Sequence, residues 1–128
     1  MKRIGVLGAL VGLIAAITIL SGVLQMCWPA LVLGFVGGQT GATADHFFGI
    51  IGMFMVLFGG LMLHGVLADS APALLWSSLQ KFGAVAAVVL GVYHSIFSSM
   101  ALGVAGFDLL SGLLAIFYWH KIARIGEP

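Results

Sequence analysis

One uncharged run close to the N-terminus, IGVLGALVGLIAAITILSGVL at residues 4–24, points to the class of protein. Crossing the roughly 30 Å of hydrocarbon in a bilayer takes about 20 helical residues, so this run is long enough to span a membrane. A cleaved secretory signal has a shorter apolar region and small residues at its cleavage site. Bulky Met26, Cys27 and Trp28 follow the run instead. We therefore predict a retained helix at about residues 4–26.

Three more apolar segments continue the pattern and predict helices at about 44–67, 72–97 and 103–121. Residues 82–120 contain no Lys, Arg or Glu and one Asp, which is enough apolar chain for two crossings with a tight turn near 98–103. Residues 28–42 are too short to cross, and we expect them at the outer interface. Short connections place successive helices antiparallel. The predicted fold is an all-α, integral-membrane, up-down-up-down four-helix bundle forming one domain over residues 1–128.

The positive charges predict the orientation of this bundle. Lys2 and Arg3 precede the first apolar run, Lys81 comes just after the polar loop, and Lys121 and Arg124 follow the last run. Loops rich in Lys and Arg stay on the cytoplasmic side of inner membranes. The threading puts all five cations on one side, so we predict a bacterial inner-membrane protein with both termini in the cytoplasm.

Composition excludes several other classes. The chain is 62% apolar and 7% charged, whereas soluble domains have about 25% charged residues. The net charge of +1 gives no reason to expect a nucleic-acid partner. Cys27 is the single cysteine, so the chain can form neither an internal disulfide nor a multi-cysteine metal site.

Small residues recur at four-residue spacing and predict faces where helices pack closely. These positions are Gly8 and Gly12 on the first helix, and Gly83, Ala87, Gly91 and Ser95 on the third. The expected partners are therefore the bilayer itself and either a second copy of the chain or a larger membrane complex.

Polar side chains within the apolar segments fall into two layers. The predicted outer layer holds Asp45, His46, His94 and Asp108, and the inner layer holds His64, His120 and Lys81. The inner residues resemble interfacial histidines and a snorkelling lysine. Two histidines on different helices are also the arrangement that ligates haem b.

Asp108 is the most informative of these residues. A carboxylate at the centre of a bilayer costs about 2.5–3.5 kcal/mol on insertion scales and normally pairs inside the protein. One hypothesis is a pair with His94 or His46 that serves as a proton relay, a substrate anchor or, with all three residues, a metal site. The alternative is a first-turn acid that offsets the helix dipole and bonds Ser98 or Ser99.

Three functions remain open from these residues. The first is an accessory or partner-binding module with no chemistry and no cofactor of its own. The second is a redox component that binds haem b or a quinone through intramembrane His and Asp side chains. The third is an oligomeric transporter of ions or small molecules. An enzyme is less favoured because neither a nucleophile elbow nor an HExxH motif occurs.

The layout also resembles that of the small DoxX-like bacterial membrane proteins. The resemblance is carried by Asp45-His46 opening the second helix, by the glycines after it (Gly49, Gly52, Gly59 and Gly60) and by Asp108 in the fourth helix. It implies a four-helix membrane fold with the N-terminus inside. Some proteins of that group are associated with quinone-linked sulfur oxidation, and this sequence has no motif that carries such an activity over.

Overall fold

A computed structural model describes residues 4–125, and all regular secondary structure in this range is helical. The helices are α1 (Val6–Cys27), α2 (Pro29–Phe35), α3 (Ala42–Leu67), α4 (Ala71–Tyr93) and α5 (Ala101–Ile125). Four of them, α1, α3, α4 and α5, are long and apolar enough to cross a membrane. The predicted all-α class and its four long apolar helices are therefore confirmed.

The ends of α4 and α5 differ from the prediction. Ser70 begins α4 as its N-cap, with its Oγ accepting a hydrogen bond from the Ala73 N–H at 3.4 Å. The helix ends at Tyr93 rather than at residue 97, because the chain turns at Ser95, whose φ is 59°. Helix α5 then starts at Ala101 and extends to Ile125, beyond the predicted end at residue 121.

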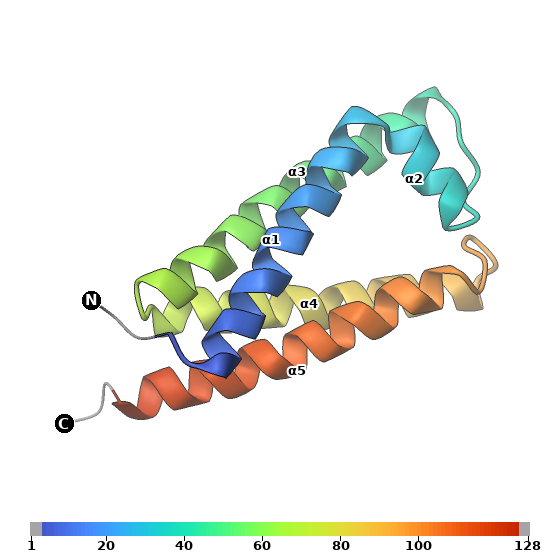
Figure 1. Cartoon of the computed structure of the whole chain (residues 1–128). Helices are drawn as coiled ribbons and strands as arrows, with labels where there is room; N and C mark the ends of the chain where they lie inside the picture. Colours follow the sequence, from blue (N-terminus) through green and yellow to red (C-terminus); the bar gives the residue numbers. More distant parts are fainter. Residues whose placement is uncertain (1–3, 126–128) are drawn as a thin grey trace.

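The long helices associate as two hairpins, α1 with α3 and α4 with α5 (Figure 1). In the first hairpin the backbones touch, since a Cβ added to Gly22 would lie 2.6 Å from the Gly52 carbonyl oxygen. Close by, the Gln25 Nε2 donates to the Phe48 carbonyl at 2.8 Å. Glycine on both helices is what permits this distance of approach.

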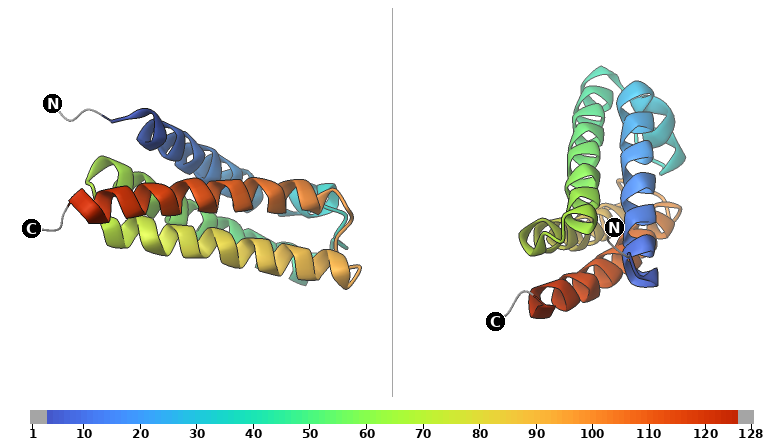
Figure 2. Two further views of the ribbon diagram at one scale, coloured as in Figure 1. Left: turned by 90° about the horizontal axis from the view of Figure 1, so that it is seen from below. Right: turned by 60° about the vertical axis from the view of Figure 1, so that its left-hand side comes forward.

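The two hairpins meet at one end and diverge towards the other, and Figure 2 shows that they run in different directions. At the closed end, side chains from all four long helices form one apolar core. Its buried members are Val11, Ile14, Ala15, Met62, Val66, Leu74, Ala115 and Tyr118. Helix α1 begins and helix α5 ends at this closed end (Figure 1).

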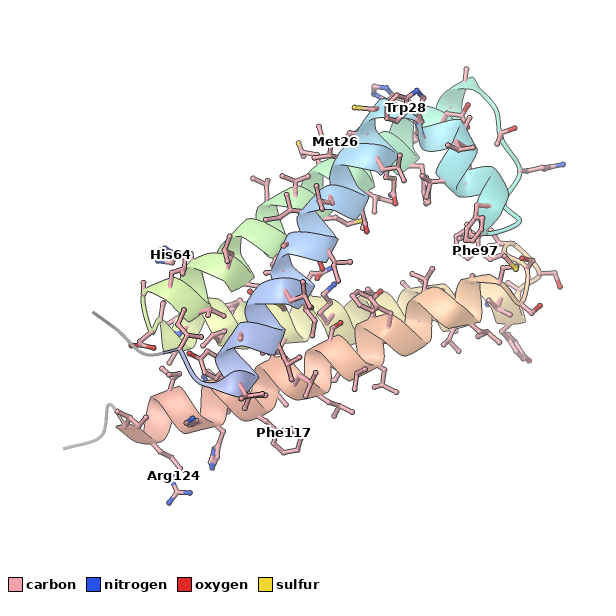
Figure 3. The ribbon with its side chains drawn as sticks, viewed as in Figure 1. Met26, Trp28, His64, Phe97, Phe117 and Arg124 are labelled. Carbon is pink, nitrogen blue, oxygen red and sulfur yellow. The ribbon has the colours of Figure 1, made fainter. Side chains whose placement is uncertain are left out.

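The short helix α2 bridges the open end. It turns back from α1 so that Leu33 and Val36 are buried against Ala101, at the start of α5. The Ser98 N–H donates to the Val36 carbonyl at 2.9 Å, and Phe97 packs beside the end of α2 (Figure 3). We predicted a segment too short to cross a membrane, and α2 has only seven residues. It packs against the second hairpin at the open end.

The predicted packing faces are found on α1 but not on α4. Gly8 is buried, and a Cβ added there would lie 3.1 Å from the Tyr118 Oη. A Cβ added to Gly12 would lie 4.0 Å from the Val66 Cγ1. On α4, by contrast, Gly83 is exposed with no atom within 4 Å of an added Cβ.

The rest of the predicted α4 face makes no close interhelical contact within the described chain. Ala87 and Ser95 are exposed, and Gly91 is covered by the Phe97 ring from the turn that follows α4. The prediction that Gly83, Ala87, Gly91 and Ser95 form a helix-packing seam is therefore wrong for the packing of this chain on itself. Four-residue spacing defines a face of a helix, but it does not say which way that face points.

Candidate functional site

Lys81 lies near the middle of α4 and connects both hairpins. Its Nζ donates to the Thr18 Oγ1 on α1 at 2.7 Å and to the Asp108 Oδ1 on α5 at 3.2 Å. The side chains of Lys81 and Asp108 are only 4% and 13% exposed. The same ammonium lies 5.4 Å from the centre of the Phe107 ring. This polar cluster, Lys81, Asp108 and Thr18, is the buried ionic site of the described chain.

The prediction that Lys81 snorkels at the inner interface is wrong. Helix α4 starts at Ala71, so Lys81 lies about 15 Å along the helix axis at about 1.5 Å per residue. Its side chain is directed inward, where an isolated charge would be very costly. Asp108 supplies the opposite charge and Thr18 a further acceptor, which is how charges inside a membrane are usually accommodated.

Asp108 does not pair with His94. His94 is the exposed C-cap residue of α4, about 20 Å farther along the helix axis than Lys81. The alternative, a first-turn acid bonded to Ser98 or Ser99, is also wrong because the first turn of α5 contains no acidic residue. The Ser98 hydroxyl donates instead to the Val36 carbonyl at 3.3 Å.

The other predicted outer-layer residues stay at the start of α3. The Asp45 Oδ1 accepts a hydrogen bond from the Gly41 N–H at 3.2 Å, a local contact at the helix terminus. His46 is exposed, and its ring makes an edge-to-face contact with the neighbouring Phe47 ring. Within residues 4–125 no three His, Cys, Asp or Glu side chains gather as a metal site would require. The predicted metal set of His46, His94 and Asp108 is therefore not assembled.

The predicted inner-layer histidines lie at the closed end and do not join Lys81. His64 is exposed and projects away from the molecule (Figure 3). His120 is also exposed, beside the Trp119 ring. The three residues of the predicted inner layer are therefore not together. His64 and His120 are exposed at the closed end, while Lys81 contacts Asp108, which we had assigned to the outer layer.

A cavity of about 590 Å³ lies between the hairpins, next to the polar cluster. It separates the closed-end core from the α2 contacts, and residues from α1, α2, α3, α4 and α5 line it. Most of its wall is apolar, for example Ile17, Val32 and Phe107. The polar side chains on the wall are Thr18, Ser21, Gln25, Gln80, Lys81 and Asp108.

The cavity is accessible from the side, between α1 and α5. Ile17 and Ser21 on α1 line it and are exposed, as are Gly103 and Val104 on α5. These two helices border the same gap on the face turned to the viewer in Figure 1. The opening is bordered by α1 and α5, which are both long and apolar enough to cross a membrane.

Thr18 is a site residue that the sequence analysis did not single out. A lone threonine in an apolar helix commonly satisfies its hydroxyl on its own backbone, so it gives little signal. A stronger signal was available for the charged pair. Lys81 and Asp108 are opposite charges on successive apolar helices, each about two turns or more inside its helix, and the cost of burying either alone favours their pairing.

Comparisons with protein-family models, with curated proteins and with solved structures found no match, so the interpretation of this cavity depends on its own residues.

Proposed function

We propose that this protein is a multi-pass membrane protein that binds a small, lipid-soluble molecule between its two hairpins. The observation that carries the proposal is the cavity of about 590 Å³, with mostly apolar walls and the Lys81–Asp108 pair at its side. Ligand pockets typically have about 300–1,000 Å³ and an apolar lining with a few placed polar groups. The cavity has this size and composition.

The cost of the ion pair supports a functional role. Replacing a buried ion pair by apolar residues of similar volume is often neutral or stabilising, so folding alone gives little reason to keep one. Ionisable side chains inside membranes commonly mark the path or site of a substrate. Lys81 and Asp108 both line the cavity, so their polar groups are available to a bound molecule.

The same proposal includes the orientation, with both termini in the cytoplasm of a bacterial cell. Lys121 and Arg124 lie at the closed end, and a Cβ added to Gly5 would be 3.8 Å from the Lys121 Nζ. Lys2 and Arg3 precede α1 in the sequence but lie outside the described residues. Lys81 is inside the protein and no longer counts as a loop charge. The remaining cations still favour a cytoplasmic closed end.

A pair of glycine variants on α5 tests the binding site. Gly103 and Gly106 are both exposed, and an added Cβ meets no atom within 4 Å at either position. Only Gly103 lines the cavity. In purified full-length protein, Gly103→Phe should weaken saturable binding of radiolabelled undecanol by about tenfold or more, about 1.4 kcal/mol. Gly106→Phe is the matched control and should bind as the wild type does. Equal binding by the two variants would contradict the proposed site.

A second candidate function is association with another membrane helix, through the face of α4 that this chain leaves uncovered. Gly83 and Ala87 are exposed on that face, and small residues at this spacing let helices approach closely. Gly83→Leu should then shift the detergent-solubilised protein to a smaller species in size-exclusion chromatography. An unchanged elution volume would count against this association.

The structure supports the other functions considered from the sequence (haem binding, quinone binding and transport) to different degrees. A haem b held by two histidines has no support, because His46, His64, His94 and His120 are all exposed and none lines the cavity. A quinone or a transported small molecule would use the same cavity as the proposed ligand. The resemblance to DoxX-like proteins stays a prediction.

A further inference from the structure

We infer that the cavity takes an uncharged, long-chain molecule with a hydroxyl group, and that this hydroxyl bridges the Lys81 ammonium and the Asp108 carboxylate. The inference depends on the proposed function, since it specifies the chemical class of ligand for the same cavity. It is based on the charges lining the cavity and on the hydrogen-bonding groups that the polar cluster leaves unused.

The charge balance indicates an uncharged ligand. Among the described residues that line the cavity, Lys81 and Asp108 are the only Lys, Arg, Asp or Glu side chains, and they neutralise each other across 3.2 Å. A charged ligand would bring an unpaired charge into a space with mostly apolar walls. Burial of an uncompensated charge is far more costly than burial of a hydrogen-bonded neutral group. A carboxylate ligand would also face the like charge of Asp108.

Lys81 has one donor left for a ligand. An ammonium group has three N–H donors and no acceptor. Two of them are directed to the Thr18 Oγ1 and the Asp108 Oδ1. The other neighbour of the Nζ is the Phe107 ring, whose centre is 5.4 Å away and which also lines the cavity. An oxygen atom placed there would be a stronger acceptor than the ring face.

Asp108 likewise has an acceptor left. Its Oδ1 receives the Lys81 hydrogen bond, while its Oδ2 has no hydrogen-bond partner among residues 4–125. No side-chain N or O atom in this range is both fully buried and without a partner, so the Oδ2 keeps accessible surface. Lys81 and Asp108 both line the cavity and are in contact with each other, so its wall has an ammonium with one unused donor next to a carboxylate with one unused acceptor.

A hydroxyl is the smallest neutral group that satisfies both. It has one O–H donor and accepting lone pairs, so it can donate to the Asp108 Oδ2 while it accepts from the Lys81 Nζ. An ether or a ketone satisfies only the lysine, and an alkane satisfies neither group. The attached carbon chain would lie against apolar side chains such as Ile17, Val32 and Phe35.

A competition series of matched chain length tests the inference on the purified full-length protein. Radiolabelled undecanol is displaced by undecanol, decyl methyl ether, dodecane or undecanoate. Each hydrogen bond to a charged group that a competitor cannot make should weaken its binding by about tenfold. The expected order is undecanol, then the ether, then dodecane, with undecanoate no better than dodecane.

The control is the double variant Lys81→Met/Asp108→Leu, which removes both charges and leaves neither one unpaired. In this variant undecanol and dodecane should bind equally. Equal displacement by all four compounds in the wild type would overturn the hydroxyl inference and leave the cavity proposal standing. The same conclusion would follow if the double variant still bound undecanol more tightly than the ether and the ether more tightly than dodecane. If undecanol shows no saturable binding to the wild type, the cavity proposal fails together with the inference.

Discussion

The Nζ of Lys81 on α4 lies 3.2 Å from the Oδ1 of Asp108 on α5, and the same ammonium donates to Thr18 on α1. The ion pair links α4 to α5 within the second hairpin. The hydrogen bond from Lys81 to Thr18 links that hairpin to α1 in the first hairpin. The contact lies beside the cavity rather than in the closed-end core. We therefore expect these three side chains to control both the stability of the protein and the shape of the cavity wall.

Replacing one residue of the Lys81–Asp108 ion pair should destabilise the protein more than replacing both residues together. Lys81→Met or Asp108→Leu alone leaves a buried charge without its partner, which typically costs about 3–5 kcal/mol. The double variant removes both charges and should be more stable than either single variant. Reversible unfolding in mixed detergents measures all three changes. Additive losses in the double variant would show that the two charges are not coupled.

Loss of the Thr18 hydroxyl should destabilise the contact between the hairpins. Thr18→Val keeps the shape of the side chain but removes the acceptor that lies 2.7 Å from the Lys81 Nζ. The expected loss in unfolding free energy is about 1–2 kcal/mol, because one hydrogen bond to a charged group disappears.

Thr43→Val on the exposed start of α3 is the control for Thr18→Val and should change the unfolding free energy by less than about 0.5 kcal/mol. The same detergent unfolding assay compares the two variants. Equal effects at the two positions would show that the bond to Lys81 contributes nothing.

Two glycine-to-alanine changes in the first hairpin should have opposite effects. Gly22→Ala places a Cβ 2.6 Å from the Gly52 carbonyl, so the helices must separate, at a typical cost of about 1–3 kcal/mol. Gly60→Ala meets no atom within 4 Å and should stabilise α3 by about 0.5–1 kcal/mol through its higher helix propensity. Thermal unfolding followed by circular dichroism should give a lower Tm for Gly22→Ala and a higher Tm for Gly60→Ala than for the wild type. A Gly22→Ala protein as stable as the wild type would contradict the backbone contact.

Cysteine labelling of intact cells should reveal the orientation. Cys27 is exposed at the open end, which the proposal puts outside the cell. A membrane-impermeant maleimide should therefore label it in intact cells. In Cys27→Ser/Ala68→Cys the new thiol lies in the exposed loop at the closed end and should react only after lysis. The reverse labelling pattern would place the termini outside.

The sequence predicted some of the site residues but not their partners. It singled out Asp108 and Lys81, because charges are rare in these segments, but assigned them to different layers. Lys81 follows a polar loop and resembles an interfacial cation, although its side chain points into the protein. His94 looked like a partner for Asp108 until the early end of α4 placed it at the exposed C-cap.

Local sequence was enough to predict the four long apolar helices, because length and hydrophobicity are properties of each segment and need no knowledge of its neighbours. Which side chains meet inside the protein depends on the rotation and offset of one helix against another. Those follow from the contact of Gly22 with Gly52, from the turn at Ser95 and from the return of α2 over the open end. The Lys81–Asp108 contact and the cavity beside it therefore appear only once the helices are packed together.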